Sequence, residues 1–440
     1  MMRQHAQAST ESAAAARASA RDCARTSYGR LLSLLASRTG DLGGAEDALA
    51  DAFRVALETW PERGIPDNPD AWLLTTARNR LADVRRSAAA RTSVELDDNE
   101  IEAALISDVD LDAIPDDRMK LLFVCAHPAI DDALRAPMML QTVLGVDADV
   151  IARAYLVPAS AMAQRLVRVK RKIKQAGIPF ELPSRSDMGR RLEAVLEAIY
   201  GAFSIGWDLA AETIGNTTDD DLAEEAQYLA DLLVQMLPNE PEVLGLAACL
   251  TLAAARRPAR VSAEGRYVQL DHQDTALWNS EQIAWGERLL LRARASGAVG
   301  RFQLEAAIQS VHMDRARSGT TDWQALALLY EGLMRAAPSI GAAVGRAIAI
   351  GHSQRPIAGL AALDLIDASA RETFQPAWAA RAHLLTMAGQ HHQAIEAVKC
   401  AIALAHGPRV LQDLQRRHAE LIALRKDVAK HALTEGLRKV

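Results

Sequence analysis

Apolar and polar positions alternate most clearly between residues 147 and 174, where the spacing predicts two short amphipathic helices joined by a turn. The residues that recur on one side of the first helix are Val150, Ile151, Ala154 and Tyr155. Asp147 precedes them and is placed to cap this helix by accepting backbone N–H bonds. Pro158 begins the second helix, because proline cannot donate the next helical hydrogen bond but fits the first turn of a new helix.

The second helix is predicted to be apolar on one side and basic on the others. Its buried stripe consists of Met162, Leu166, Val169 and Ile173. Its remaining surface carries Arg165, Arg168, Lys170, Arg171, Lys172 and Lys174, with no acid among them. Gly177 and Pro179 then end the helix. Such a helix is either an ordinary solvated basic helix or the reading helix of a helix-turn-helix, and the short helix and turn before it favour DNA binding.

If this pair of helices binds DNA, its residues divide into two groups. The first turns of a reading helix meet base edges, so we expect Ser160, Gln164 and Arg165 to select the sequence. The later cations meet phosphates and add salt-dependent affinity that does not distinguish one sequence from another. These are Arg168, Arg171, Lys172 and Lys174.

Residues from about 28 to 91 are predicted to form a separate helical unit of at least three helices. Asp41 opens one of them, and its outer side carries an acidic ridge of Glu46, Asp47 and Asp51. On the pattern alone, this ridge is the solvated side of a surface helix.

The stretch 60–69 holds three prolines and one glycine, so we expect a shaped loop there. A further helix starts at Asn68 and Pro69, in which Trp72 is expected to pack in the core and not to stack on bases. Its residues available to an anionic partner are Arg78, Asn79, Arg80, Arg85 and Arg86.

Length and composition favour an all-α protein of two or three domains. The chain has 440 residues, 50% of them hydrophobic but only 4% aromatic, and alanine and leucine abound. The net charge of −6 is unevenly distributed, because 78–91 and 165–174 are basic and 94–117 is strongly acidic. The acidic stretch is either a linker or a strand that imitates nucleic acid in a positively charged channel of a partner.

Beyond Pro183 the basic character fades and helical patterns continue to the end. The small and large positions of a tetratricopeptide-type helix pair are matched by Trp378, Ala382, Leu385, Ala394, Val398 and Ala401. Stacked helix pairs are therefore expected. The segment 260–273 is less regular and predicts a loop or short hairpin inserted among the helices.

The four cysteines, Cys23, Cys125, Cys249 and Cys400, have no paired spacing, so neither a disulfide framework nor a zinc site is predicted and a reducing cytoplasm fits. Cys125 and His127 are candidate metal ligands in principle, but packing is the expectation. No apolar run is long enough to span a membrane. We find no phosphate loop and no nucleophile motif, so no enzymatic activity and no cofactor are expected.

Taken in order, several stretches resemble a bacterial extracytoplasmic-function sigma factor of the long subgroup with a tetratricopeptide-like C-terminal extension. They are GAEDALADAF at 44–53, GIPDNPDAWLLTTARNRLAD at 64–83, LLFVCAHPAI at 121–130, YLVPASAMAQRLVRVKRKIKQAGIPF at 155–180, RFQLEAAIQSVHM at 301–313 and TDWQALALLYEGLM at 321–334. The resemblance implies sigma region 2 at 24–91, an acidic linker at 92–117, sigma region 4 at 118–180 and a helical-repeat domain at 186–440. Residues 1–23 are rich in Ala, Ser and Arg and poor in acids, as in an organelle transit peptide, but we expect a flexible tail there.

The same resemblance implies roles for individual residues. Glu46, Asp47 and Asp51 would dock on the clamp helices of core RNA polymerase. The minus-ten promoter element would be held by Arg63, Asn68, Arg78, Asn79, Arg85 and Arg86, with one base turned out of the stack. The region 4 helix would read the minus-thirty-five element. The family often shows Cys-Cys-His-Pro where this chain has Cys125, Ala126, His127 and Pro128, which weakens any metal assignment.

The resemblance leaves the control of activity open. Nothing in the chain resembles a membrane-bound regulator, so regulation is expected to come from the C-terminal domain, through an intramolecular contact or a regulatory protein. The alternative is a one-component regulator in which the helix-turn-helix is the only DNA reader and the helical repeats sense a ligand or protein.

Overall fold

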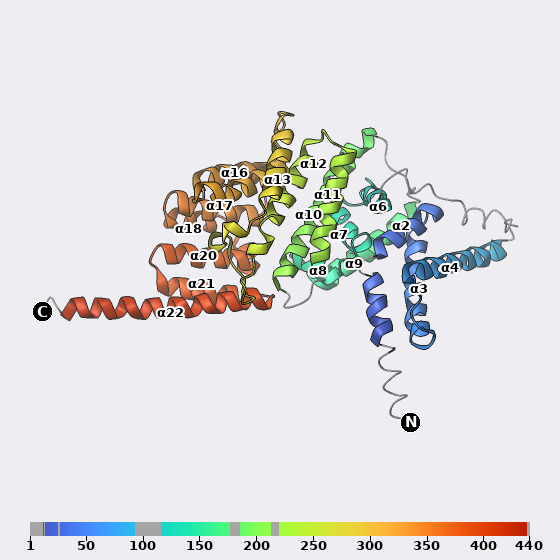
Figure 1. The fold of residues 1–440 in the computed structure, drawn as a ribbon, viewed down its shortest axis with the longest axis horizontal. Coiled ribbons are helices and arrows are strands. Elements are labelled where there is room, and N and C mark those ends of the chain that lie inside the picture. Colours follow the sequence, from blue (N-terminus) through green and yellow to red (C-terminus); the bar gives the residue numbers. More distant parts are fainter. Residues whose placement is uncertain are drawn as a thin grey trace, which may run out of the picture. The chain divides into compact units, whose positions relative to one another are not determined.

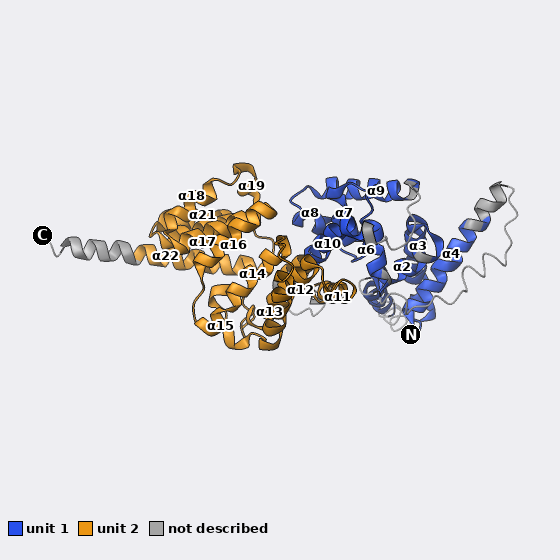
Figure 2. Ribbon diagram, turned by 90° about the horizontal axis from the view of Figure 1, so that it is seen from above, with its two compact units in different colours: residues 1–202 blue, residues 203–440 orange. Residues whose placement is uncertain are grey.

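The structure is a computed structural model that describes residues 12, 14–24, 27–92, 116–176, 185–212 and 220–437. Its named elements are all helices (Figure 1), which confirms the all-α class. Within these ranges the strand-type pairing is an isolated antiparallel bridge between Val261 and Tyr267. The chain forms two compact units, residues 1–202 and 203–440 (Figure 2). The expected linker at 92–117 lies mostly outside the described residues.

The first unit contains eight named helices in the described part of the chain. They are α2 (Tyr28–Thr39), α3 (Leu42–Arg63), α4 (Pro69–Thr92), α6 (Asp117–Cys125), α7 (Asp132–Thr142), α8 (Ala148–Ala154), α9 (Ala159–Ala176) and the first part of α10 (Arg185–Glu212). α2, α3 and α4 pack on one another, and α2 also packs on α6. α9 packs on α8, α7 and α3, so the N-terminal group of helices and the predicted helix-turn-helix pair share one core.

The start of α3 follows the sequence expectation, but its end does not. The Asp41 side chain accepts a hydrogen bond from the Gly44 N–H at 2.9 Å and caps the helix. α3 then continues through Pro61, and only residues 64–68 of the expected loop are non-helical. Trp60 is 2% exposed and meets Trp72 edge-on, with ring centroids 5.5 Å apart. This buried contact holds the last turn of α3 in place although proline interrupts its hydrogen bonds.

The predicted pair of helices at 147–174 is present as α8 and α9, with two local differences. Asp147 is the N-cap residue of α8, but its side chain makes no capping hydrogen bond. Ala154, expected on the inner side, is exposed, and Ala152 is buried instead, beside Ile151. A helix of only seven residues turns less than twice, so a small rotation changes which alanine faces the core.

The turn between α8 and α9 places a leucine where the backbone favours glycine. Leu156 has a φ of 53°. Its N–H bonds the Arg153 carbonyl at 3.1 Å, and the Val157 N–H bonds the Ala152 carbonyl at 2.9 Å, which together close a Schellman motif. A side chain at this left-handed position costs about 1–2 kcal/mol, so the turn is locally strained.

The N-terminal segment also differs from expectation. Residues 14–24 are helical, although 14–23 were assigned above to a flexible tail. Ala16, Ala20 and Cys23 are buried, because their spacing places three small side chains on one side of a helix. Burial raises the pKa of the Cys23 thiol to about 11, and the Asp70 carboxylate adds to the shift.

The boundary before the C-terminal domain lies later than expected. α10 begins at Arg185, and its first half belongs to the first unit, which ends at residue 202 and not before 186. Val195, Ile199 and Ala202 on this part of α10 are buried. Arg191 donates to the Phe123 carbonyl at 3.1 Å, so the start of α10 is tied to α6. The loss of basic residues after Pro183 therefore marks a change in surface charge. The core of the first unit continues beyond it into α10.

The second unit contains the rest of α10 and a series of helices connected by short turns. They are α11 (Asp220–Met236), α12 (Pro241–Ala254), α13 (Ser280–Arg294), α14 (Arg301–Met313), α15 (Arg315–Ser318), α16 (Trp323–Ala336), α17 (Ile340–Ser353), α18 (Pro356–Asp364), α19 (Ala368–Thr373), α20 (Gln375–Met387), α21 (His391–Ala403) and α22 (Pro408–Leu437). Short 3-10 turns lie at Arg257–Ala259, Leu270–His272 and Thr275–Leu277. In the described residues, no helix is both long and apolar enough to cross a membrane.

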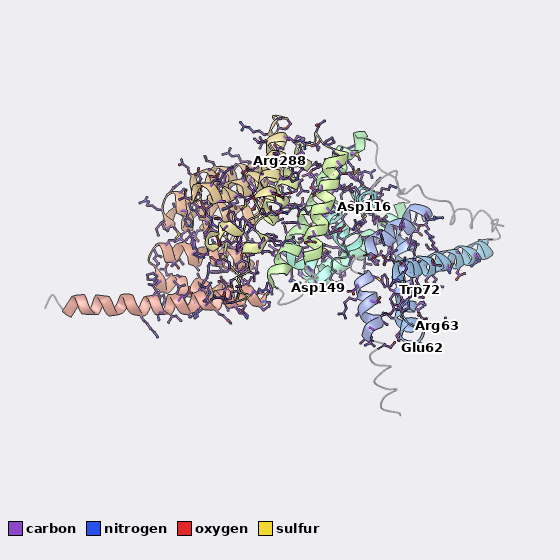
Figure 3. The ribbon with its side chains drawn as sticks, viewed as in Figure 1. Glu62, Arg63, Trp72, Asp116, Asp149 and Arg288 are labelled. Atoms are coloured by element: carbon purple, nitrogen blue, oxygen red, sulfur yellow. The ribbon has the colours of Figure 1, made fainter. Side chains whose placement is uncertain are left out.

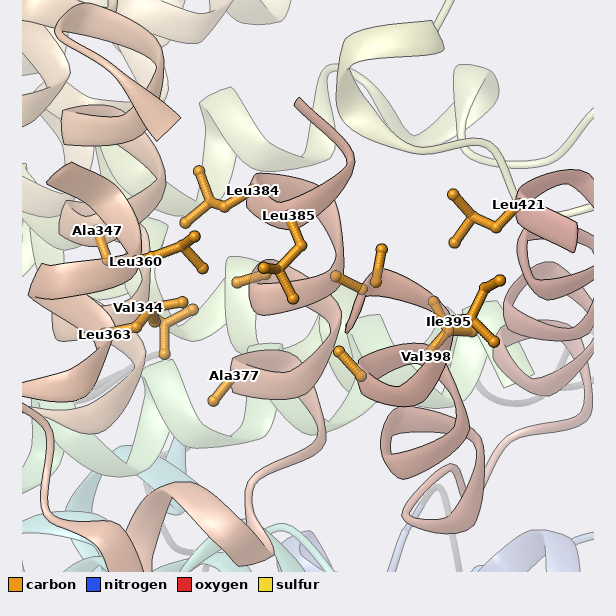
Figure 4. Packing of buried hydrophobic residues seen from close by; sticks show 14 residues of the cluster. Val344, Ala347, Leu360, Leu363, Ala377, Leu384, Leu385, Ile395, Val398 and Leu421 are labelled. Carbon is orange, nitrogen blue, oxygen red and sulfur yellow. The ribbon is translucent and has the colours of Figure 1, made fainter. Parts of the chain in front are cut away.

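Consecutive helices of the second unit pack as neighbours, as expected for helix pairs. α16 packs on α17, α17 on α18, α20 on α21 and α21 on α22. Figure 4 shows the apolar cluster between α17, α18, α20, α21 and α22, with Leu360, Leu384 and Val398 among its buried side chains. α17 and α18 approach so closely that a Cβ on Gly359 would lie 2.6 Å from the Ala347 carbonyl oxygen. The segment 260–273 is an irregular hairpin-like loop around the Val261–Tyr267 bridge, which confirms that prediction.

The strained turn at Leu156 gives a stability prediction. Leu156→Gly should raise the unfolding free energy by up to about 1 kcal/mol, because the relief of left-handed strain exceeds the added entropy of a glycine in the unfolded chain. Leu156 is 52% exposed, so little packing is lost. The measurement is denaturant unfolding, with Leu156→Ala as the control that keeps a Cβ and gains nothing. A glycine variant no more stable than the alanine variant would contradict the assignment of strain.

Candidate functional site

One side of α9 packs against neighbouring helices, and its other side is exposed to solvent. Its predicted stripe is fully confirmed, since Met162, Leu166, Val169 and Ile173 are each no more than 5% exposed. The residues predicted to meet DNA that are exposed on α9 are Ser160, Gln164, Arg165, Arg168, Arg171 and Lys172. The side chain of Lys174 lies outside the described residues. At about 100° per residue, Ser160, Gln164, Arg168 and Arg171 lie on the side opposite the stripe, whereas Arg165 and Lys172 lie along one edge of it.

Among the described cationic side chains of α9, Lys170 is the one that is not fully exposed. It lies on the flank of the stripe and forms a short ion pair with Glu46 of α3. The two side chains are 24% and 21% exposed, so the pair is largely shielded from water. Cys125 lies close by; burial raises its pKa, and the Glu46 carboxylate acts in the same direction. The predicted polymerase-binding helix and the predicted DNA-reading helix are therefore in direct contact.

The three acids predicted to bind polymerase do not share one side of α3. Asp47 and Asp51 are four residues apart and lie on one side, whereas Glu46 is turned by roughly 100° from Asp47. Asp47 and Asp51 line a hollow of about 570 Å³ between α3 and α4, together with Arg54, Arg80 and Val84. The expected acidic ridge is thus split into an open acidic hollow and a single acid that faces α9.

The charge of Asp51 is already balanced within the hollow. Its carboxylate contacts Arg54 and Arg80, each with an N–O distance of 2.9 Å. The exposed side chain of Arg54 also bonds Glu58 at 2.7 Å. Arg80, expected to be available to an anionic partner, is instead engaged by α3. Asp47 is exposed at the rim, so a cationic partner would meet Asp47 before Asp51.

The residues predicted to hold the minus-ten element are spread along α4 and the loop before it. Arg63 ends α3 and is exposed, and Figure 3 shows it together with Trp72 of α4. The Asn68 side chain accepts from the Ala71 N–H at 3.0 Å and so caps α4. Asn79 and Arg86 are exposed and, seven residues apart, lie on one side of α4. The side chain of Arg85 lies outside the described residues.

Arg78 is half-buried, whereas Arg63, Asn68, Asn79 and Arg86 are exposed. Burial lowers the pKa of its guanidinium, and the like charge of Arg38 on α2 lowers it further. The buried Nε of Arg78 has no hydrogen-bond partner among the described residues. Arg38 was not predicted as a site residue, because only the packing of α2 against α4 brings the two arginines together.

Cys125 and His127 do not form a metal site with other described residues. Cys125 is fully buried, and the Nδ1 of His127 accepts a hydrogen bond from the Ala129 N–H at 3.1 Å. Within the described part of the chain, no group of three histidine, cysteine or acidic side chains is arranged to hold a metal ion. Burial lowers the pKa of His127, and Arg191 and Arg135 act in the same direction.

Comparison with known proteins finds two family matches and one relative. Sigma-70 region 2 matches residues 24–91, the segment assigned to region 2 from the sequence. A family of unknown function (DUF6596) matches residues 191–294. An uncharacterized protein of Rhizobium meliloti (strain 1021) is 36% identical over 368 residues, which cover 82% of this chain and 86% of the relative. No solved structure matches the chain. Residues 24–91, which include α2, α3 and α4, thus match sigma-70 region 2, and this match supports a sigma-70 family factor.

Proposed function

We propose that this protein is an RNA polymerase sigma factor of the extracytoplasmic-function type, in the long subgroup with a tetratricopeptide-like extension. The match to sigma-70 region 2 implies binding to core RNA polymerase and to promoter DNA. In this proposal the protein brings the polymerase to the minus-thirty-five and minus-ten elements and helps to open the DNA, while the polymerase performs all catalysis. The match of region 2 to α2–α4 is the observation that carries the proposal.

α9 is the element that we assign to the minus-thirty-five element. Its buried stripe fixes the rotation of the helix, so Ser160, Gln164 and Arg165 point away from the core near its N-terminal end. Residues at this end of a reading helix meet base edges in the major groove. Arg168, Arg171 and Lys172 follow on the outer side, where they suit phosphate contacts.

α3 and α4 supply the other two contacts in this proposal. The hollow that contains Asp47 and Asp51 offers carboxylates to a basic surface of the polymerase. Asn79 and Arg86 form the outer side of α4 available to the minus-ten element, and Arg63 lies at the C-terminal end of α3, before the loop that leads into α4. Arg78 and Arg38 concentrate positive charge between α2 and α4, which favours an anionic partner there.

The contact between α3 and α9 requires this unit to open on a promoter. The two promoter elements are centred about 25 base pairs, or about 85 Å, apart along B-form DNA. Laid end to end, the 24 residues of α4 and the 18 residues of α9 would measure only about 63 Å. Helices that pack together lie about 8–10 Å apart, so the closed unit cannot reach both elements at once. The Glu46–Lys170 pair must therefore separate when both are bound.

The second unit is the candidate regulator of this step. Its stacked helix pairs suit a tetratricopeptide-like repeat, which offers surfaces to a protein partner or to another part of the same chain. Because bacterial RNA polymerase acts in the cytoplasm, the proposal places the protein there.

Purified core polymerase tests the proposed function directly. Added to core enzyme and a library of promoter fragments, the full chain should produce transcripts that start at defined positions. The alternative, a one-component regulator, predicts specific DNA binding with no transcripts from core enzyme alone. Specific binding without initiation would contradict the proposal.

The two groups of α9 residues should respond differently to substitution. Gln164→Ala and Arg165→Ala should each cost about 1–3 kcal/mol on the preferred promoter and relax sequence choice, because they remove base contacts. Arg171→Ala and Lys172→Ala should weaken all DNA about equally and reduce the salt dependence. Binding to preferred and scrambled DNA at several salt concentrations checks this, with the exposed Arg335→Ala of α16 as the control for loss of charge. Equal effects from both groups would contradict the major-groove assignment.

The ion pair between α3 and α9 should oppose binding to core polymerase. Lys170→Met keeps the aliphatic stem but removes the charge, and loss of about 1 kcal/mol from the closed form should tighten binding roughly fivefold. Titration of core enzyme without DNA measures this. Lys172→Met is the matched control, because Lys172 is exposed on the same helix. Unchanged affinity of the Lys170 variant would show that the contact does not restrain the unit.

A further inference from the structure

A cavity of about 510 Å³ lies inside the second unit, away from every residue assigned to polymerase or promoter DNA. One wall is the irregular segment 260–273, which contributes Arg260, Tyr267 and Gln269. The opposite walls come from α17, α20 and α22. Gln269 donates to the Asp413 carboxylate of α22 at 2.9 Å and so holds the two sides together. Arg315 fixes the segment from behind by donating to the carbonyls of Asp271 and Gln273 at 2.7 and 2.9 Å.

Two arginines make cation–π contacts with one indole ring beside this cavity. The guanidinium carbons of Arg260 and Arg256 lie 3.9 and 5.0 Å from the ring centroid of Trp207. Arg260 is only 6% exposed, and it donates to the Trp207 carbonyl at 2.6 Å. Burial lowers the pKa of Arg256 to about 10, and the like charge of Arg260 acts in the same direction.

Neither of these cations has a carboxylate in an ion pair among the described residues. The buried Nε of Arg256 also has no hydrogen-bond partner there. Asp413 lines the cavity but is already engaged by Arg416, Arg417 and Gln269. Asp208 and Asp271 line it as well, but both are exposed, so water screens their charge. The partners of Arg260 are the carbonyl and indole of Trp207 and the side chain of Tyr267, which carry no negative charge, and the exposed Asp208, whose charge acts on Arg260 from outside the core. An anion in the cavity beside Arg260 would therefore offset the cost of burying this guanidinium.

The rest of the lining indicates what kind of anion fits. Aliphatic side chains from three helices face the cavity, namely Val344, Ile348, Ala379, Ala380, Val410 and Leu414. A cavity of this volume is in the range that holds small organic ligands. A hydrated inorganic ion would leave the apolar walls in contact with water, whereas a molecule with a charged end and an apolar body would cover both kinds of surface.

We propose that this cavity is a binding site for a small organic carboxylate with an apolar body. Arg260 holds the carboxylate, and the aliphatic residues of α17, α20 and α22 hold the body. Arg256, Arg260 and Trp207 all lie in the segment matched by the family of unknown function, so the proposal gives that segment a chemical role. It goes beyond the transcriptional role proposed above and does not depend on it.

Calorimetric titration of the full chain tests the site without any transcription assay. The probes are octanoate, octanamide as the uncharged molecule of the same shape, and inorganic phosphate. Arg260→Gln removes the positive charge that would hold the carboxylate of the ligand. Arg288→Gln is its matched control, because Arg288 also stacks on a tryptophan, Trp285 at 5.2 Å, but on an exposed side of α13 (Figure 3). Val410→Phe keeps both arginines and narrows the cavity.

Octanoate should bind with a stoichiometry of one, and octanamide and phosphate should bind at least tenfold more weakly. Arg260→Gln and Val410→Phe should each weaken octanoate at least tenfold, and Arg288→Gln should leave it unchanged. Circular dichroism melting of each variant confirms that it is folded. The proposal is overturned if octanoate does not bind, if octanamide or phosphate binds as tightly, or if folded Arg260→Gln retains the affinity of the original chain.

Discussion

Burial of one apolar stripe on α9 is the constraint on which the first unit depends. Four aliphatic side chains, Met162, Leu166, Val169 and Ile173, are removed from water, each worth about 1.5–3 kcal/mol. Because they fix the rotation of α9, they determine at once which residues face solvent and which residue meets α3. Arg165 and its exposed neighbours are presented outward, and Lys170 is brought to Glu46. One packing interaction thus sets both the proposed DNA surface and the contact that closes the unit.

That contact links the two proposed roles of the unit. A protein that holds Glu46 against Lys170 keeps its two promoter readers too close together to occupy both elements. The Asp47–Asp51 hollow, in contrast, remains open on α3 and α4. Polymerase can therefore approach one side of α3 while α9 still covers another. In this account, separation of the ion pair follows docking, and the energy of polymerase and promoter contacts offsets its loss.

Periodicity predicted the elements well because local packing decides them. The α9 stripe, the Asp41 cap and the all-α class all follow from residues within a few turns of one another. Helical spacing could also have separated Glu46 from Asp47 and Asp51, since a difference of one residue turns a side chain by roughly 100°. Contacts between distant residues were not predictable. Glu46 and Lys170 are 124 positions apart, and no local pattern marks them as partners. Tertiary burial also explains three other differences from the sequence predictions, because it overrides local signals. They are the packing of Trp60 beside Pro61, the buried helix at 14–24 and the late domain boundary in α10.

The second unit shows where buried charge remains after the helices have packed. Its cores are built from alanine and leucine, and close approaches such as Gly359 against α17 leave little free volume. The cavity beside Arg260 is an exception in the described residues, because cationic groups lie there next to aliphatic walls without a carboxylate ion pair for Arg256 or Arg260. The helical periodicity of the sequence does not predict such a site, because Trp207, Arg260 and Arg417 come from separate parts of the chain.

The distance between α3 and α9 tests the central claim most directly. Spin labels at Leu57→Cys and Val167→Cys, both exposed positions, in a Cys400→Ser background would report it by pulsed electron resonance. The account predicts a single short distance in the free chain and a distance longer by several tens of ångströms in the complex with core polymerase and promoter DNA. A distance that stays short in a transcribing complex would contradict it.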